Sequence, residues 1–150
     1  MFALPLLCTL ALAPAATPPS QEQQALWTAI DDLRRTVAMY EAIVAVQEKR
    51  RPFAWVARQK RRHERRLVAI AVKLGHGDPP VLWNAREFVA PRARVEACAQ
   101  AKRQELRNAA IYETALGVVD AASARAHLRR ILQKTRYRHL VTFEACAAAG

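Results

Sequence analysis

Apolar side chains recur along this chain at alternating spacings of three and four residues, in four separate stretches. Such spacing places one apolar stripe along an α-helix of 3.6 residues per turn, so each stretch predicts an amphipathic helix. The chain of 150 residues is 52% hydrophobic, which excludes a disordered or low-complexity protein. With only 4 glycines, an all-β sandwich is disfavoured as well. We therefore expect an all-α domain.

The helix-capping and helix-breaking residues between these stretches predict how the helices connect. The expected helices cover residues 20–48, 53–75, a third stretch from Val95 to Val119, and 121–148. Ser20 and Asp120 are candidate N-caps, Pro52 separates the first two helices, and Gly75 ends the second. Residues 76–91 hold three prolines and form a long surface link. Two helix pairs joined by one long link predict an up-down four-helix bundle with a crossover between helices 2 and 3.

Residues 1–16 are almost wholly apolar and are interrupted by Pro5 and Pro14. They are too short for a membrane span but suit a secretory signal peptide, with Ala13-Pro14-Ala15 supplying the small residues that signal peptidase needs. We expect residues 17–150 to form the mature bundle in the periplasm or outside the cell. The alternative is that residues 1–16 form a buried strand or helix of the domain itself.

Removal of the leader leaves two cysteines, Cys98 and Cys146. An even pair in an exported protein is most simply one disulfide, although two separate buried thiols remain the alternative. Cys98 lies seven residues before Glu105, and Cys146 lies seven residues after His139. In antiparallel neighbouring helices these offsets bring the two cysteines to the same level, which favours the disulfide.

Five ionisable or imidazole side chains interrupt the apolar stripes. They are Lys60 and His63 on the second helix, Glu105 on the third, and Arg136 and His139 on the fourth. Charged groups are seldom buried unless they are paired or bind a metal. The pattern therefore predicts a polar cluster midway along the bundle.

Several stretches carry a resemblance to ferritin-like proteins. They are Tyr40-Glu41-Ala42-Ile43, Arg51-Pro52-Phe53, His63 in its helix, Arg94-Val95-Glu96-Ala97-Cys98, Glu105 seven residues before Tyr112, and His139-Leu140 before Phe143 and Cys146. Over essentially the whole mature chain, the sequence resembles an exported bacterial ferritin-like family of unknown function, of the rubrerythrin/ferritin four-helix type. The resemblance implies a di-metal centre built from one carboxylate each on helices 1 and 3 and a Glu-x-x-His motif on helices 2 and 4.

Three of the implied metal ligands are replaced here. Leu33 stands where helix 1 would supply a carboxylate, while Lys60 and Arg136 stand where each Glu-x-x-His motif begins. Asp32 and Glu41 lie nearby, but at about 100° per residue each points away from the Leu33 direction. Two fixed cations beside the remaining ligands repel a metal ion. We therefore expect a degenerate, metal-free centre in which Lys60 and Arg136 bridge Glu105 and the histidines are neutral hydrogen-bonding partners.

Two alternatives remain open for these residues. The charged side chains could lean out to solvent at the edge of the bundle. Otherwise His63, Glu105 and His139 could retain a single iron, manganese or zinc ion, since three such ligands suffice for a site with an open position. The first expectation gives a non-catalytic bundle without a cofactor, whereas a retained metal gives a metal-dependent oxidoreductase.

A strongly basic stretch runs from Lys49 to Arg66, in a chain with a formal net charge of +11. Its members off the apolar stripe are Arg58, Arg61, Arg62, Arg65 and Arg66. They predict a cationic surface that either only keeps the protein soluble or attracts anionic envelope components such as lipid phosphates. Nucleic acid is not an expected partner of an exported protein, and the sequence shows no nucleic-acid motif. No nucleophile triad or phosphate-binding loop is present either.

Overall fold

The computed structural model describes residues 18–81, 83–84 and 88–149, and all regular structure in these ranges is helical. The elements are α1 (Gln21–Val46), α2 (Phe53–Lys73), α3 (Arg94–Val118), α4 (Ala122–Lys134), the π-helical segment η2 (Thr135–Leu140) and α5 (Val141–Ala148). The prediction of an all-α fold is confirmed. The predicted signal peptide, residues 1–16, lies outside the described residues.

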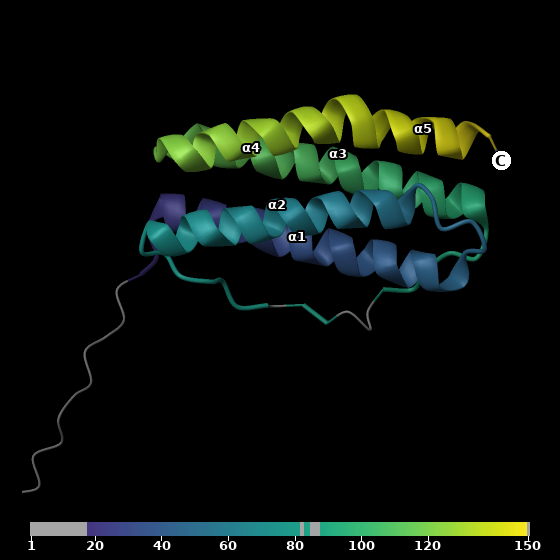
Figure 1. The fold of residues 1–150 in the computed structure, drawn as a ribbon, viewed down its shortest axis with the longest axis horizontal. Coiled ribbons are helices and arrows are strands. Elements are labelled where there is room, and N and C mark those ends of the chain that lie inside the picture. Colours follow the sequence, from purple (N-terminus) through teal and green to yellow (C-terminus); the bar gives the residue numbers. More distant parts are fainter. Residues whose placement is uncertain (1–17, 82, 85–87, 150) are drawn as a thin grey trace, which may run out of the picture.

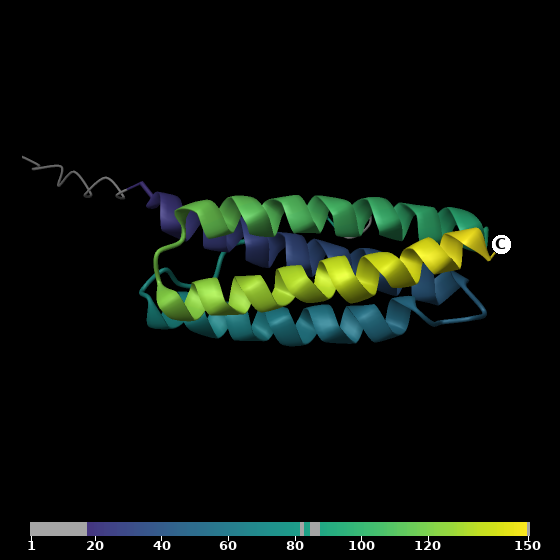
Figure 2. The ribbon, with the colours of Figure 1, turned by 90° about the horizontal axis from the view of Figure 1, so that it is seen from above.

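The described residues form four helical rods, because α4, η2 and α5 follow one another without a break (Figure 1). Helix α1 packs along α2, and α3 packs along the α4–η2–α5 rod. The two pairs are stacked so that α3 contacts α1 while α4 contacts α2 (Figure 2). This arrangement is a four-helix bundle, as the spacing of the apolar residues predicts.

The helix ends follow the local sequence closely, with one exception. The Ser20 hydroxyl accepts a hydrogen bond from the Gln23 backbone N–H, and Gly75 adopts a φ of 79° just after α2. Asp120, in contrast, does not cap the fourth rod, because the N-cap position falls on Ala121. A carboxylate from another helix replaces it: the Ala121 N–H donates to Glu22 Oε1 at 3.0 Å.

The described residues just after α2 and just before α3 are hydrogen-bonded to opposite ends of α1. After α2, the carbonyl of His76 accepts a hydrogen bond from the Trp27 indole at 3.1 Å, near the start of α1. Before α3, the carbonyls of Pro91 and Arg92 accept hydrogen bonds from the Gln47 side chain, just beyond the end of α1. The described residues that flank the link therefore lie near the start of α1 and just beyond its end, and Figure 1 shows the described part of the link alongside the bundle.

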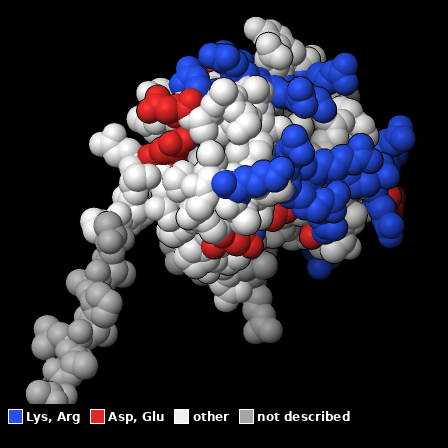
Figure 3. Space-filling view, turned by 60° about the vertical axis from the view of Figure 1, so that its left-hand side comes forward, with Lys and Arg blue, Asp and Glu red and all other residues white. Residues whose placement is uncertain are grey.

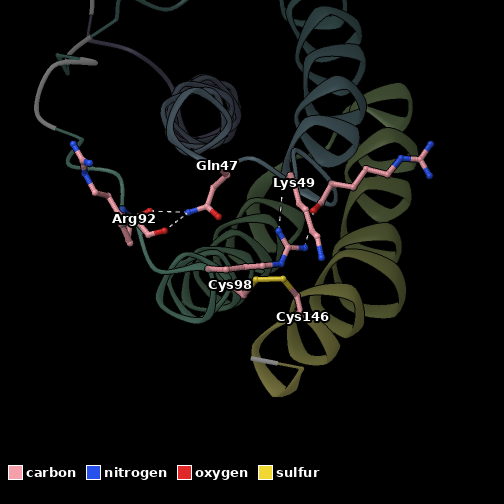
Figure 4. The surroundings of a disulfide bond; sticks show 8 residues. Gln47, Lys49, Arg92, Cys98 and Cys146 are labelled. Atoms are coloured by element: carbon pink, nitrogen blue, oxygen red, sulfur yellow. Dashed lines mark hydrogen bonds between the residues drawn. A yellow bond between two sulfur atoms is a disulfide. The ribbon is translucent and has the colours of Figure 1, made fainter.

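A disulfide joins Cys98 near the start of α3 to Cys146 in α5 (Figure 4). Their Cα atoms are 5.7 Å apart, well within the usual range for a bridged pair. Nearby, the Arg94 guanidinium donates to the carbonyls of Lys49 and Arg51 and so ties α3 to the turn between α1 and α2. The bridge forms between the two cysteines that the sequence predicts.

Two apolar clusters fill the interior. One is built around Leu26, Ile30, Leu67, Tyr112, Leu128 and Ile131, and the other around Tyr40, Ile43, Phe53, Ala101 and Phe143. Each helical rod contributes to both clusters, and between its two contributions each rod carries buried polar residues. None of the described helices is long and apolar enough to cross a membrane.

Candidate functional site

The buried polar layer between the two apolar clusters draws on all four rods. Its members are Thr36 on α1, Lys60 and His63 on α2, Glu105 and Asn108 on α3, and Thr135 and His139 on η2, each at most 6% exposed. Seven buried polar residues at one level break the core into two halves. This layer is the candidate functional site.

Glu105 lies at the centre of the layer and is fully buried. Lys60 Nζ donates to its Oε2 at 2.8 Å, and the Tyr40 hydroxyl donates to its Oε1 at 2.6 Å. His139 Nδ1 lies 3.3 Å from Oε2, although it lacks the alignment of a hydrogen bond. Three different rods therefore supply polar atoms to one carboxylate from the fourth.

The ammonium of Lys60 has further partners. With the Asn108 amide oriented to satisfy its neighbours, the amide oxygen accepts from Lys60 Nζ at 2.6 Å and the amide nitrogen donates to Asp32 Oδ2 at 2.7 Å. Lys60 Nζ also lies 5.7 Å from the centroid of the Tyr112 ring, on its face. A buried charge with this many partners avoids most of the cost of an unpaired ion.

The electrostatics of the layer follow from these contacts. Burial favours the protonated form of Glu105, but Lys60 and His139 outweigh it and lower the pKa of this carboxyl to about 2. Burial lowers the pKa of His139, with Lys60 acting in the same direction and Glu105 opposing both. At neutral pH the centre therefore holds an ionised Glu105 carboxylate beside a neutral His139 imidazole.

Arg136 does not belong to this layer, so the prediction that it bridges Glu105 needs correction. Its side chain is about half exposed and forms an ion pair with Glu113. The reason is the π-helical segment η2, which accommodates one extra residue in the turn. The extra residue moves the inward-facing position before His139 by one residue along the chain. The fully buried Thr135 therefore occupies the position expected for Arg136.

Helix α1 also differs from expectation. Asp32 is only 4% exposed, although its position on the helix predicts that it points away from the centre. Its side chain lies in the interface between α1 and α3, where the side chains of Gln104 and Asn108 donate hydrogen bonds to its carboxylate. Burial raises the pKa of Asp32 to about 6, opposed chiefly by the charge of Lys60. Leu33, in contrast, is buried in the apolar cluster around Leu26.

His63 is buried but makes no hydrogen bond or ion pair with Glu105 in the described chain. Its ring lies 5.3 Å from the ring of His127, whose Nε2 is 3.2 Å from the His63 carbonyl oxygen. Its own Nε2 has no partner among the described residues. Burial, helped by cations that include Lys134, lowers the pKa of His63 to about 3. His63 therefore belongs to the α2–α4 side of the layer.

A di-metal centre does not fit these residues. Among the described residues, no three His, Cys, Asp or Glu side chains are grouped so that they could hold a metal ion. The Oε2 atom of Glu105, which a metal would need, already accepts from the Lys60 ammonium at 2.8 Å. A cation fixed to the chain at this distance competes directly with a metal for the same oxygen.

The structure adds residues that sequence reasoning did not assign to the site. Asn108 and Thr36 join the network around Lys60, and Tyr40 binds Glu105 directly. A signal was available for Asn108, because it lies three residues after Glu105 and thus on the same helix face. Tyr40 lies on an apolar stripe. Spacing alone does not show whether a tyrosine there only packs in the core or also donates a hydrogen bond to a buried carboxylate.

The basic surface is a second candidate site. Arg58, Arg61, Arg62, Arg65 and Arg66 are all exposed along α2. Lysine and arginine side chains gather over one side of the bundle with few acidic neighbours (Figure 3). Arg61 forms an ion pair with Glu41, which is itself about half exposed and lies outside the polar layer. The other four arginines of this stretch form no ion pair with any described residue.

Comparison of the chain with protein-family models, with curated proteins and with solved structures finds no match. The fold and the site by themselves define a class of protein, a disulfide-bonded four-helix bundle with a buried polar layer. That bundle is compatible with a ferritin-like fold.

Proposed function

We propose that this protein is an exported, ferritin-like bundle with a binding role, in which an internal ion pair replaces the di-metal centre. The observation that carries the proposal is the contact of 2.8 Å between Lys60 Nζ and Glu105 Oε2, both side chains being fully buried. An ammonium at this position supplies the positive charge that a metal would otherwise supply. The layer thus holds its carboxylate without a metal ion.

The ferritin-like assignment is supported by how the helices connect. The link between α2 and α3 joins opposite ends of the bundle, which corresponds to the one long crossover of ferritin-like folds. The polar layer lies midway along the rods, where such bundles place their metal ligands. The disulfide between Cys98 and Cys146 suits an oxidising compartment, which agrees with a signal peptide over residues 1–16.

A binding role is favoured over a redox role by the polar layer and by the surface. The layer has its charges paired and lacks a group of metal ligands in the described residues. The surface, in contrast, carries Arg58, Arg62, Arg65 and Arg66 without an ion pair to any described residue, and Figure 3 shows Lys and Arg side chains gathered over one side of the bundle. Such a surface attracts polyanions, and for an exported protein these are anionic components of the envelope.

The metal content of the purified protein tests the proposal. We expect a near-zero content of iron, manganese, zinc and copper in mature protein isolated from the periplasm without a His tag, also after incubation with each metal. The reason is that Lys60 competes for the carboxylate of Glu105. Elemental analysis by plasma mass spectrometry measures this directly.

The matched variants are Glu105→Gln and Glu113→Gln, which remove a buried and an exposed carboxylate from the same helix. About one metal per chain that is lost in Glu105→Gln but kept in Glu113→Gln contradicts the proposal. That result would make a metal-dependent oxidoreductase built on His63, Glu105 and His139 the better account.

A further inference from the structure

A pocket of about 320 Å³ opens beside the buried layer, between α2 and the junction of α4 with η2. Four cationic side chains line it, namely Arg58 and Arg62 from α2, Lys134 from α4 and Arg138 from η2. Gln59 and His63 complete its polar lining. The two cations on α2 are four residues apart, and so are the two on the α4–η2–α5 rod, so all four belong to faces of the two rods that meet at the pocket.

These four cations lack compensating charge. No carboxylate lines the pocket, and none of the four forms an ion pair with any residue that the structure describes. Two neighbouring arginines outside the pocket are neutralised, because Arg61 pairs with Glu41 and Arg136 pairs with Glu113, whereas the exposed Arg65 and Arg66 form no ion pair with a described residue. Like charges four residues apart on a helix repel each other, so the unpaired set costs stability unless an anion joins it.

A buried polar atom gives a second, independent indication. His63 lines the pocket and is only 6% exposed, yet its Nε2 has no hydrogen-bond partner in the described chain. Buried polar atoms without partners are rare and call for a specific cause. A ligand in the pocket that accepts a hydrogen bond would provide one. Burial and the nearby charge of Lys134 lower the pKa of His63, and a bound anion would act in the opposite direction.

We propose that this pocket binds a terminal phosphate group, either free inorganic phosphate or the phosphate monoester of an envelope lipid. Three guanidinium groups offer forked donors that match the oxygens of a phosphate, and Lys134 adds a further positive charge. A volume of about 320 Å³ lies at the lower end of the range for ligand sites, which suits one phosphate and its substituent. This inference rests on the binding role proposed above, but it does not depend on the metal-free centre.

Calorimetric titration with inorganic phosphate at about 0.15 M salt, where diffuse surface attraction is largely screened, tests the proposal. The variants are Arg58→Gln/Arg62→Gln within the pocket and Arg65→Gln/Arg66→Gln outside it. Both remove two positive charges from the same helix. We expect phosphate affinity to fall at least about tenfold in the first variant and less than about twofold in the second. Equal losses in the two variants, or no phosphate binding to the wild type together with no vesicle binding, overturn the proposal.

Two further readouts define the source of the phosphate and the role of His63. Vesicles of phosphatidylcholine with phosphatidic acid, which carries a monoester phosphate, are compared with vesicles of phosphatidylcholine alone. Binding only to phosphatidic acid vesicles, weakened in the pocket variant, assigns the pocket to a lipid phosphate; binding of inorganic phosphate without vesicle binding assigns it to a small ligand.

In the same samples, NMR titration of His63 should show its pKa rising when inorganic phosphate or the lipid binds. An unchanged His63 titration at saturating phosphate contradicts the pocket. A metal-binding protein that still binds phosphate would refute the proposed ion-pair centre alone, whereas a metal-free protein that binds neither inorganic phosphate nor phosphatidic acid vesicles would refute the pocket alone.

Discussion

Replacing Lys60 with methionine is expected to lower the free energy of unfolding by about 3–5 kcal/mol at neutral pH, since it leaves a buried carboxylate without its counter-ion. Lys60 and Glu105 are both fully buried and 2.8 Å apart, so neither has water to take the partner's place. Methionine keeps most of the side-chain volume, which makes the lost charge the main change. Urea unfolding followed by circular dichroism measures the difference.

Two variants separate lost pairing from general damage. Lys102→Met removes a cation whose partner, Glu144, lies at 3.1 Å on the surface, and it should cost less than about 1 kcal/mol. The double variant Lys60→Met/Glu105→Gln removes both buried charges and should recover much of the lost stability. If Lys60→Met costs no more than Lys102→Met, the ion pair does not organise the polar layer.

Removal of the disulfide is the second large effect. The double variant Cys98→Ala/Cys146→Ala should lose about 2–4 kcal/mol, because the bridge closes a loop over a sequence separation of 48 residues and restricts the unfolded chain. The bridge also ties α5, which has few buried residues of its own, to the start of α3. The expected result is a lower urea midpoint.

Reduction provides the matching control. Wild-type protein treated with a reductant should lose a similar amount of stability, and the double variant should not respond to the reductant at all. A double variant as stable as the oxidised wild type would show that helix packing alone holds the end of the bundle.

Much of the bundle could be predicted from the sequence, because apolar spacing reports directly which helix face is buried. Lys60, Glu105 and His139 interrupt the apolar stripes, and each is fully buried in the structure. The pairing of Cys98 with Cys146 followed from equal heptad offsets in antiparallel helices. In a regular helix, spacing along the sequence determines both which face a residue lies on and at which level of the bundle it lies.

The wrong predictions concern positions where the helix is not regular or where burial depends on a neighbouring helix. Arg136 faces outward because η2 adds a residue to the turn, and no spacing rule for an α-helix anticipates a π-helical turn. Asp32 is buried because Gln104 and Asn108 of α3 offer it partners, a property of the pair of helices rather than of α1. The pocket between α2 and α4 likewise depends on the packing of two rods.

The polar layer also bears on why the bundle has one register. A buried ion pair contributes little net stability, since desolvation offsets the attraction. Shifting one helix by a turn, however, would separate Lys60 from Glu105 and leave both charges unpaired. We infer that the layer selects this alignment of the rods, as single buried polar residues do in coiled coils.

The ionisation of Glu105 is the most direct test of the internal ion pair. The pKa of this carboxyl is lowered to about 2 from an ordinary value of 4.5, so the stabilisation is fully present above pH 4.5 and is lost as the pH falls toward 2. Carbon-13 NMR of the Glu105 carboxyl, assigned with Glu105→Gln, should show an ionised group down to about pH 3 and no shift when zinc is added. A carboxyl that titrates at or above pH 4.5, or that shifts in proportion to added zinc, would contradict the account.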